Sequence, residues 1–407
     1  MISRSYKYRM YPTEDQKVLL SKTFGCVRVV WNANVETFNS WDREKNPKPV
    51  YKTSTEIRAQ HEWMKEVSAA ALQQKEIDFK EFRKQFFSKS RKIKQARCRF
   101  KSKYDRQSYR LPNQKFTLKL HSIRLEKIGA IKLVVDRRPP EDSKFMSVTV
   151  SRDSTGAYYA SVLVQEELKS QVVPTGKPIG IDLGLKDFVV TSAGERIAAP
   201  QHFRKSQAEL KKTQRHMSRK KKGSNRYKKC KLKVARIHKH VAAQRSWFHH
   251  QVANWLLESY DFIGMEDLNA KGMVKNRRLA KSISDAGWSS FGSILAYKSS
   301  WRSKTIQKVD RFFPSSKLCS DCGAKNVNLQ LSDREWVCVE CGVVHDRDEN
   351  AAVNVEIESL RIFGEGSIEA QGVACALRMQ SGCKTPGFHP GASCVEASIK
   401  PAFYGLS

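Results

Sequence analysis

The spacing of hydrophobic and polar positions changes several times along this chain, and each change predicts a different element. Residues 3–11 read as a strand that stops at Pro12, and Thr13-Glu-Asp-Gln16 then has the form of a capping box that opens a helix. Apolar residues continue that helix at roughly helical spacing, at Leu19, Leu20, Phe24, Val27 and Trp31. The chain is therefore predicted to begin with a strand and a long helix.

Residues 53–100 are predicted to be mostly helical, and Lys and Arg are dense from 83 to 106. The apolar residues available for a core in the helical block are Trp63, Leu72, Ile77, Phe79, Phe82, Phe86 and Phe87. Aromatic residues are interleaved with the basic ones, at Phe86, Phe87, Phe100, Tyr104 and Tyr109. They could stack on exposed nucleic-acid bases, although aromatic residues more often belong to a core.

From Phe116 the period becomes two, which predicts strands. The alternating sets are Phe116, Leu118 and Leu120, then Ile131, Leu133 and Val135, then Met146, Val148 and Val150. Ser154-Thr-Gly156 is a turn, after which Tyr158 to Val164 resumes the pattern. We expect a small antiparallel sheet or barrel. The first strand could join it, in which case the helical block is an insertion.

A second domain is predicted after a linker at residues 172–176. Asp182 lies in a short apolar strand, where a carboxylate is costly to bury unless charge or hydrogen bonds compensate it. Further strands are predicted at Phe188-Val-Val-Thr and near Glu195-Arg-Ile. A later strand, from Tyr260, ends in Glu266. Taken singly, each acidic residue could be an ordinary exposed side chain, and Gly-x-Asp-x-Gly is a weak motif shared by nucleases and sugar kinases.

Four cysteines near the C-terminal end have the spacing of a zinc site, C-x2-C-x15-C-x2-C. They are Cys319, Cys322, Cys338 and Cys341. Four thiolates leave no open position for water, so one structural Zn²⁺ is favoured over a catalytic one. His345 could replace a ligand, and Trp336 is expected to pack inside the segment.

An acidic run, Asp346-Arg-Asp348-Glu-Asn350, follows the cysteines directly. Asp182 on a first strand, Glu266 on a later strand and an aspartate at the start of a terminal helix form the acidic set of an RNase H-like fold. Three such carboxylates can hold two Mg²⁺ ions, which prefer oxygen ligands and promote phosphodiester hydrolysis.

Charge narrows the class of partner. The chain has 74 Lys and Arg against 41 Asp and Glu, a formal net charge of +33. Such an excess needs a polyanion. Nucleic acid is favoured over a membrane surface, because no apolar run approaches twenty residues and no signal peptide is recognised. With no export signal, a reducing cytoplasm is the simplest interpretation. The six scattered cysteines are expected to be free thiols, the alternative being another metal site in the tail.

The basic excess is concentrated at residues 204–245, which hold 17 Lys or Arg and a single acidic residue, Glu209. A thin apolar stripe predicts paired helices broken at Lys222-Gly-Ser224. We expect a phosphate-binding surface rather than a merely solvated charge run. The candidate contact residues are Arg219, Lys220, Lys221, Lys222, Arg226, Lys228 and Lys229.

Several segments together give a specific resemblance over most of the chain. They are Tyr8-Arg-Met-Tyr-Pro12, Arg99-Phe-Lys-Ser-Lys-Tyr-Asp-Arg-Gln-Ser-Tyr109, Gly180-Ile-Asp-Leu-Gly184, Met265-Glu-Asp-Leu-Asn269, Asn276 to Trp288, Phe313 to Gly323 and His345 to Ala352. With these the chain resembles the TnpB (OrfB) family, compact transposon-encoded RNA-guided nucleases related to type V CRISPR effectors. The resemblance implies that Asp182, Glu266 and Asp348 are the catalytic metal ligands. Asp346 is the second choice to Asp348, and Asp267 is expected to be a neighbour only.

The resemblance also implies a multidomain protein of α+β and α/β class. A wedge β-barrel is expected from residues 1–14 and 107–170, with a helical recognition lobe inserted at 15–106 and a linker at 171–177. An RNase H-like RuvC nuclease domain is expected at 178–315 and 345–362, with the basic insertion at 204–245 and a zinc ribbon at 316–344. The tail, 363–407, is expected to be disordered.

The function implied is Mg²⁺-dependent, RNA-guided cleavage of double-stranded DNA beside a short adjacent motif. Expected partners are a guide RNA encoded by the element and the target DNA, with no membrane and a monomer favoured. The expected location is the cytoplasm of a bacterium or archaeon, at the nucleoid. The alternatives are a nuclease-inactive RNA-guided repressor, which intact acidic positions disfavour, and an unguided metal-dependent nuclease or transposase.

Overall fold

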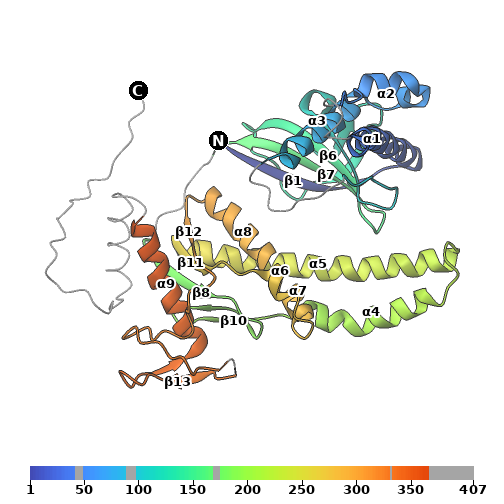
Figure 1. Ribbon diagram of the computed structural model, residues 1–407. Helices are drawn as coiled ribbons and strands as arrows, with labels where there is room; N and C mark the ends of the chain where they lie inside the picture. Colours follow the sequence, from blue (N-terminus) through green and yellow to red (C-terminus); the bar gives the residue numbers. More distant parts are fainter. Residues whose placement is uncertain (42–48, 89–97, 168–174, 331, 366–407) are drawn as a thin grey trace, which may run out of the picture. The chain divides into compact units, whose positions relative to one another are not determined.

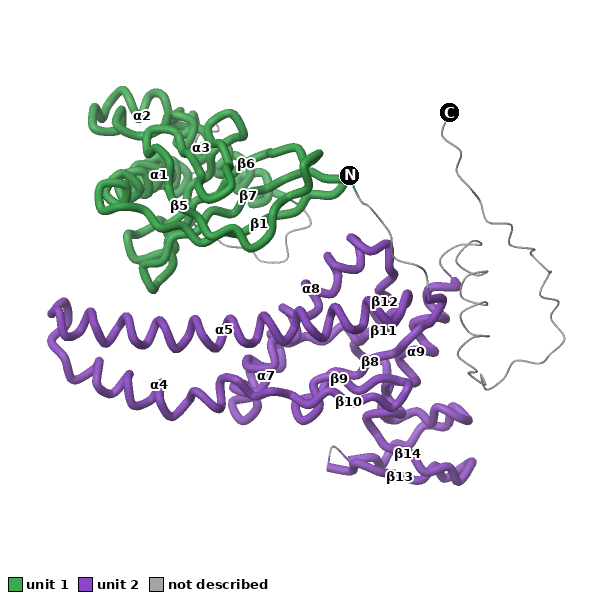
Figure 2. Tube along the Cα trace, turned by 180° about the vertical axis from the view of Figure 1, so that it is seen from behind, with its two compact units in different colours: residues 1–169 green, residues 170–407 purple. Residues whose placement is uncertain are grey.

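The chain forms two compact units, Met1–Lys169 and Ser170–Ser407, which Figure 2 shows in separate colours. The computed structural model describes residues 1–41, 49–88, 98–167, 175–330 and 332–365 (Figure 1). Each unit combines a sheet with helices around its own hydrophobic core. Most of the predicted linker at 171–177, and nearly all of the predicted tail at 363–407, lie outside the described residues.

Unit 1 (Met1–Lys169) is built on a seven-stranded antiparallel sheet with the chain's first strand in its middle. The order is β2-β6-β7-β1-β5-β4-β3, and β1 pairs with β7 along nearly its whole length. The expectation that the first strand joins the later ones is confirmed, so the helical block is an insertion between β1 and β2. The strands are β1 Ile2–Tyr11, β2 Gln107–Pro112, β3 Phe116–Leu118, β4 Ser122–Leu125, β5 Gly129–Val134, β6 Lys144–Arg152 and β7 Tyr158–Glu166.

The sequence left an antiparallel sheet and a barrel open, and the resemblance implied a wedge β-barrel; the described residues form an antiparallel sheet. Among the described residues, the edge strands β2 and β3 share no ladder and are joined by a 3-10 turn, Asn113–Lys115. Pro112 ends β2, and a proline cannot donate a hydrogen bond to a further ladder. The sheet is therefore open at these two edges.

Helices α1 and α3 cover this sheet, and α1 begins as predicted. Thr13 and Gln16 form both hydrogen bonds of a capping box, with Gln16 N donating to Thr13 Oγ1 and Thr13 N donating to Gln16 Oε1. On α1, Phe24 packs edge-on against Tyr109 of β2. The helices of unit 1 are α1 Glu14–Ser40, α2 Ser54–Gln60, the 3-10 helix Glu62–Glu66 and α3 Ala69–Phe86.

The described part of the helical block is mostly helical, as predicted, but three of its expected core residues are exposed. Helix α3 ends at Phe86, and the described residues 98–106 contain no helix. Trp63, Ile77 and Phe87 are 48%, 42% and 50% exposed. Ile77 lies two positions from the buried Phe79, off the single stripe that α3 turns inward.

Unit 2 (Ser170–Ser407) contains a five-stranded mixed sheet in the order β10-β9-β8-β11-β12. Strands β8, β11 and β12 are parallel to one another, whereas β9 runs antiparallel to both of its neighbours. The strands predicted around Asp182, Val189, Ile197 and Met265 are confirmed. Their bounds are β8 Pro178–Asp182, β9 Asp187–Thr191, β10 Arg196–Ala198, β11 Phe262–Glu266 and β12 Thr305–Val309.

Helix α9 (Arg347–Glu365) lies directly on this sheet because two glycines leave room for it. Gly180 of β8 and Gly264 of β11 are partners in register. A Cβ on Gly180 would lie 2.0 Å from the carbonyl oxygen of Ala352, and one on Gly264 would lie 2.2 Å from Ser359 Oγ. Any larger side chain at either position would push α9 away from the strands.

The other face of the sheet is covered by α5 and α8, whose Leu256 and Phe291 belong to the same core as Ile181. Helices α4 and α5 form a long hairpin that extends beyond the sheet (Figure 1). Its turn lies at residues 219–224, which confirms the predicted break between two helices. The helices are α4 His202–Ser218, α5 Asn225–Ser259, α6 Ala270–Met273, α7 Ala280–Ala286 and α8 Trp288–Trp301.

The segment between β12 and α9 contains a small two-stranded ladder, β13 (Glu335–Val337) with β14 (Val344–Asp346), and an isolated bridge between Leu318 and Lys325. Strand β14 runs straight into α9, so the cysteine segment and the helix are covalently continuous. Across the described part of the chain, every helix is too short or too polar to span a bilayer.

Candidate functional site

Three carboxylates meet at one edge of the unit 2 sheet. Asp182 ends β8 and Glu266 ends β11, and these parallel strands are paired up to Ile181 and Met265, directly before the two acids. Asp348 lies in the first turn of α9. The packing of α9 on the two glycines brings that turn to the carboxyl ends of both strands. The structure therefore brings together the three acids that the sequence singled out.

The electrostatics of this carboxylate edge favour a cation. Burial, then the negative charge of Glu266, then that of Asp348 raise the pKa of Asp182 to about 7. The backbone N–H of Leu183 and the charge of Arg347 oppose this rise only in part. Because like charges disfavour one another's ionisation, a bound divalent cation would relieve the repulsion and lower that pKa.

The other two acids accept hydrogen bonds from side chains. Arg334 Nη1 donates to Asp348 Oδ2 at 2.9 Å, and Ser315 Oγ donates to Glu266 Oε1 at 2.5 Å. Neither Arg334 nor Ser315 was singled out in the sequence, since their roles depend on how the cysteine segment folds back. Both come from the segment between β12 and α9.

The donor set suits Mg²⁺ in chemistry. All three groups are carboxylates, the oxygen ligands that Mg²⁺ takes alongside several waters. The carboxylate oxygens of these three described residues do not all lie within 4.8 Å of one another. This wider spacing is compatible with a two-ion site, because paired ions lie about 3.5–4 Å apart and share ligands with water and phosphate.

The neighbouring acids have other partners. Asp346 Oδ1 accepts hydrogen bonds from the backbone N–H of Asp348 and Glu349 and lies 2.8 Å from Arg196 Nη2. Asp346 thus caps α9, which orients Asp348. Asp267 lies 3.0 Å from Lys308 Nζ and 2.9 Å from Arg311 Nη2. These contacts are compatible with the prediction that Asp182, Glu266 and Asp348 are the metal ligands and that Asp346 and Asp267 are not.

The four cysteines form a compact cluster. Sγ of Cys319 lies 3.6 Å from that of Cys341, and Sγ of Cys322 lies 3.6 Å from that of Cys338. All four Sγ atoms lie within 4.8 Å of one another. A tetrahedral site with Zn–S bonds of about 2.3 Å requires sulfur atoms about 3.8 Å apart. The cluster is therefore compatible with a zinc site.

Tight turns build this cluster. The N–H of Gly323 donates to the carbonyl of Cys319, and the N–H of Gly342 donates to that of Cys338. Both glycines have positive φ, +78° and +71°, a conformation that other residues rarely adopt. Each Cys-x-x-Cys-Gly segment therefore folds into the same kind of turn around the cluster.

His345 is in contact with the cysteine cluster. Its Nε2 is 3.0 Å from Cys319 Sγ, and its ring packs on Trp336 with the ring centroids 4.8 Å apart. Trp336 is buried in the cysteine segment, as predicted. A neutral histidine at this position can donate an N–H to a metal-bound thiolate.

Side chains of α9 connect the cysteine cluster to the carboxylates. Asn350 and Asn354 both donate to the carbonyl of Leu318, directly before Cys319. Asn350 also accepts the N–H of Ser320. These bonds fix the start of the cysteine segment against the helix that carries Asp348. Their signal in the sequence is the pair of asparagines four positions apart, which periodicity alone does not distinguish from exposed polar residues.

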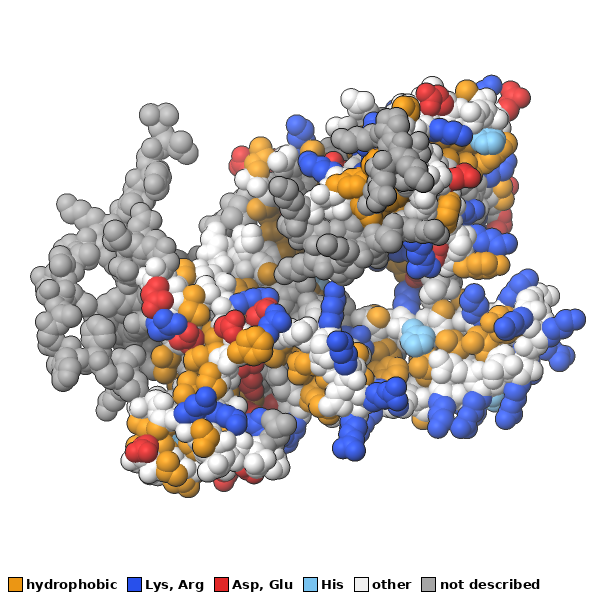
Figure 3. Space-filling model, in the orientation of Figure 1, with side chains coloured by type: hydrophobic (Ala, Val, Ile, Leu, Met, Phe, Trp, Pro, Cys, Tyr) orange, Lys and Arg blue, Asp and Glu red, His pale blue; other side chains and the backbone are white. Residues whose placement is uncertain are grey.

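The α4–α5 hairpin carries the basic residues, as Figure 3 shows along its length. The seven candidate contact residues, from Arg219 to Lys229, surround its turn and are all exposed. The stripe that joins the two helices includes the buried Leu210, Ile237 and Val241. Between the two helices, Lys233 Nζ lies 4.0 Å from Glu209 Oε1.

The aromatic residues proposed for base stacking divide into two groups. Phe86 and Tyr109 are buried and belong to the core of unit 1. Phe87, Phe100 and Tyr104 are 50%, 50% and 79% exposed. Only these three have a face available to a base.

Comparison with known families gives three matches. A family profile described as "Probable transposase" matches residues 159–277, and one described as "Cas12f1-like, TNB domain" matches residues 288–355. A third, described as "Helix-turn-helix domain", matches residues 1–41. In this structure the last range contains β1 followed by the single helix α1.

Curated relatives match over most of the chain. One from Streptomyces pristinaespiralis is 38% identical over 364 residues, covering 87% of this chain and 89% of the relative. One from Escherichia coli (strain K12), InsQ, is 28% identical and covers 86% of this chain and 91% of the relative. Both are named "Putative RNA-guided DNA endonuclease". A "TnpB-like protein" of Acanthamoeba polyphaga mimivirus is 24% identical over 51% of this chain.

Among solved structures, the cryo-EM structure of a Cas12f1–sgRNA–target DNA complex aligns with 87% of this chain and 98% of its own chain. The two share 14% sequence identity, with a TM-score of 0.46. At that score the likeness carries no inference about this chain.

Proposed function

This chain belongs to the TnpB (OrfB) family, and on that premise we propose that it is an RNA-guided DNA endonuclease. The observation that carries the proposal is the convergence of Asp182, Glu266 and Asp348 at one sheet edge, where burial and the charges of the other two acids raise the pKa of Asp182. The names of the two full-length relatives support the same activity. Target DNA would be cut beside a short adjacent motif.

The architecture we propose has an RNase H-like RuvC nuclease domain at 178–315 and 345–362. Two features of the sheet support it. The first three strands are antiparallel neighbours and the next two are parallel, and the acids lie at the carboxyl ends of β8 and β11. Residues 1–14 and 107–170 would form the wedge domain, 15–106 the recognition lobe and 316–344 the zinc ribbon.

The chemistry assigned to the three acids is phosphodiester hydrolysis. Two Mg²⁺ ions, when bound, supply activation of a water and stabilisation of the leaving oxygen. Asp182, Glu266 and Asp348 would hold them, with Asp182 ionised. Ser315 would orient Glu266 through its hydrogen bond, and the cap from Asp346 would fix the turn that carries Asp348.

We assign one structural Zn²⁺ to the four cysteines. Its role would be to hold the segment that leads into α9, because Leu318 and Ser320 are bonded to Asn350. The zinc ribbon would thereby keep Asp348 at the sheet edge. No open ligand position would remain for catalysis.

The partners proposed are a guide RNA and double-stranded target DNA. The basic hairpin, with seven exposed Lys and Arg around its turn, would bind phosphates without reading sequence. Base pairing with the guide would select the target, while the protein recognises heteroduplex shape and the adjacent motif. We favour a monomer acting in the cytoplasm at the nucleoid.

The test is to purify the full chain from cells that also express its element and to sequence any bound RNA. A plasmid that matches the guide portion is then incubated with the complex and Mg²⁺. We expect one bound RNA species and guide-dependent cutting that Asp182→Ala abolishes. Absence of bound RNA, or cutting that ignores the guide, would overturn the guided function.

Two other functions remain distinguishable by the same assay. The description "Probable transposase" for residues 159–277 favours an unguided nuclease or transposase, which would cut or join DNA without RNA. A nuclease-inactive repressor would bind the guided target and leave it intact. The three intact acids weigh against the repressor.

A further inference from the structure

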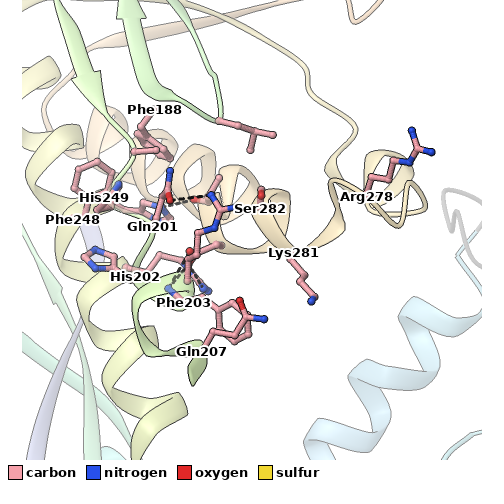
Figure 4. Close-up of a pocket in the computed structure, with 17 residues that line it drawn as sticks. Phe188, Gln201, His202, Phe203, Gln207, Phe248, His249, Arg278, Lys281 and Ser282 are labelled. Carbon is pink, nitrogen blue, oxygen red and sulfur yellow. Dashed lines mark hydrogen bonds and ion pairs between the residues drawn. The ribbon is translucent and has the colours of Figure 1, made fainter. Parts of the chain in front are cut away.

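A cavity of about 230 Å³ lies at the base of the α4–α5 hairpin, within unit 2. Its walls come from the loop after β8, the segment from the end of β10 into α4, and helices α5 and α7. Figure 4 shows Phe248 and His249 from α5 facing Gln201, His202 and Phe203 from the start of α4. We refer to this cavity as the base pocket.

The base pocket lies at the same edge of the sheet as the carboxylates. Leu185 in its wall follows Asp182 by three positions in the loop that leaves β8. On the other side, Ala198 at the end of β10 pairs with Asp187, which places the wall residue Ala199 at that edge too. The cavity and the carboxylates therefore lie at the same edge of this sheet.

Two buried polar atoms of the base pocket have no partner. They are His202 Nε2 and Arg245 Nε. The one carboxylate of the pocket, Asp285, is already satisfied, because it accepts the N–H of Phe203 at 3.0 Å and lies 3.1 Å from Arg245 Nη2. Buried polar groups in folded proteins are nearly always hydrogen-bonded, so the two orphaned atoms indicate a missing ligand or waters.

The chemistry of the walls is that of a nucleotide site. Phe203 and Phe248 supply aromatic surface, and Arg204, Arg278 and Lys281 add exposed cations around it. Burial lowers the pKa of His202, so at neutral pH its imidazole is uncharged and can both donate and accept. A nucleotide matches all of these features. Its base is an aromatic ring with hydrogen-bonding edges, and its phosphate suits the cations.

We propose that the base pocket receives one unpaired nucleobase of the DNA strand being cleaved. The proposal rests on the proposed function. At about 230 Å³ the cavity exceeds the roughly 150 Å³ that admits a benzene ring. A base of a displaced strand is already unpaired, so its entry avoids the cost of extruding it from a duplex. Holding one base here fixes the register of the strand at the carboxylates.

DNA is favoured over RNA by position. In the proposed function the carboxylates act on the DNA strand, and the pocket opens at the same edge of the sheet, which favours the substrate strand as its occupant. A guide RNA nucleotide is the competing occupant. The two differ in the 2′-hydroxyl, and probes of both kinds can be compared directly.

The test uses the purified full chain without added Mg²⁺, together with fluorescein-labelled oligothymidylate and an abasic oligonucleotide of the same length. Because every position of a homopolymer is the same, the result does not depend on which nucleotide lies at the pocket. Ser282→Phe fills the pocket from the exposed side of α7, and Gln207→Trp fills it from α4. Ser284→Phe, on α7 but outside the pocket, is the matched control.

We divide the dissociation constant of the abasic oligonucleotide by that of oligothymidylate. This ratio should fall by roughly fivefold or more in both filled variants, which is the effect of losing one stacked base. The control should keep the wild-type ratio. Photocrosslinks from 5-bromodeoxyuridine oligonucleotides should map to Phe203 or Phe248 in the wild type and disappear in Ser282→Phe.

An unchanged ratio in both filled variants, or crosslinks that map elsewhere, would overturn the proposal. A ratio that changes only for oligouridylate and its abasic counterpart would assign the pocket to RNA and overturn the DNA assignment. Guide-dependent cleavage is measured separately. If cleavage is guided but the ratio does not respond, only the base pocket is wrong. If cleavage is unguided, the proposed function fails while the binding result still stands.

Discussion

The cysteine cluster and the carboxylate edge are built in opposite ways. All four cysteines lie between residues 319 and 341, and two short glycine turns bring them together. The acids come from β8, β11 and α9, and they meet only because Gly180 and Gly264 let the helix lie on the strands. One site is local and the other depends on the whole second unit.

The two regions also differ in what a metal would do for them. At the carboxylate edge, burial and two like charges raise the pKa of Asp182, so without a cation this edge is destabilised when ionised. The cysteine cluster is linked to that edge through Asn350 and through Arg334. Damage to the cluster should therefore reach the carboxylates, whereas damage to a carboxylate should leave the cluster intact.

The largest effect expected is from Asp182→Asn. Removing one acid should lower Mg²⁺-dependent cleavage on the order of 10³-fold, since metal-assisted charge stabilisation contributes several kcal/mol. Zinc content, measured by elemental analysis, should stay at the wild-type value. Asp267→Asn is the control, because that acid pairs with Lys308 and Arg311 instead. Equal loss in both variants would contradict the separate role of Asp182.

Asp182→Asn should lower activity but raise the free energy of unfolding of the Mg²⁺-free protein at neutral pH. Because the pKa of Asp182 is about 7 in the folded protein and near 3.8 when unfolded, the folded state binds more protons between these values. The free energy of unfolding of the Mg²⁺-free protein therefore falls as pH rises from about 4 to about 7. Urea unfolding at pH 5 and pH 8 should show a smaller fall in Asp182→Asn than in wild type.

Cys338→Ser tests the link in the other direction. Loss of one thiolate should remove zinc and loosen the segment that holds α9, so cleavage should drop about 10–100-fold, as for other residues that support a metal ligand. Cys230→Ser, at a partly exposed free cysteine of the hairpin, should change neither quantity. Full cleavage by a zinc-free Cys338→Ser protein would show that the ribbon does not position Asp348.

Gly180→Ala tests the contact that assembles the carboxylate edge. Its Cβ would meet the backbone of Ala352, so α9 must move, at a cost typical of overpacking, about 1–3 kcal/mol. Both thermal stability and cleavage should fall while zinc is retained. The matched change Gly292→Ala, in α8, meets only Met265 Cε at 3.8 Å and should stabilise by about 0.5–1 kcal/mol. If Gly180→Ala cleaved at the wild-type rate, the close contact at Gly180 would not be needed to assemble the carboxylate edge.

The same contrast between local and distant contacts decides what the sequence could predict. The capping box at Thr13, the turn at Gly156 and the hairpin break near Gly223 depend on neighbouring residues, and all three were predicted correctly. The cysteine cluster is equally local, and its spacing was sufficient. For Asp182 and Glu266, the strands were visible as patterns, but the choice of Asp348 over Asp346 came from the family resemblance.

What the sequence could not give depends on residues far apart in the chain. No pattern shows that, among the described residues, β2 and β3 form no ladder with each other, or that Ile77 faces solvent. The base pocket around His202 joins segments that only the folded sheet brings together. The hydrogen bond from Arg334 to Asp348 is closer in the chain, but it depends on the pairing of β13 with β14. A glycine in a strand, such as Gly264, indicates a close approach, but its partner on α9 cannot be read from its own neighbourhood.

The smallest effect expected is on the hairpin turn, which belongs to neither the cysteine cluster nor the carboxylate edge. Replacing its basic residues with glutamine should weaken nucleic-acid binding and leave zinc content and thermal stability unchanged, because these side chains are exposed. The residues are Arg219, Lys220, Lys221, Lys222, Arg226, Lys228 and Lys229. Anisotropy titrations at several salt concentrations measure the effect.

The dependence on salt separates phosphate contacts from other causes. Each lost contact should make the slope of log affinity against log salt shallower by about 0.7–0.9, so the variant and the wild type should converge as salt rises. The control replaces Lys17, Lys22 and Lys65, which already pair with Glu14, Glu66 and Glu62, and should keep the wild-type slope. A difference in affinity that persists at high salt would mean that the turn contributes by something other than charge, and the hairpin would then need a base-reading role that its sequence does not indicate.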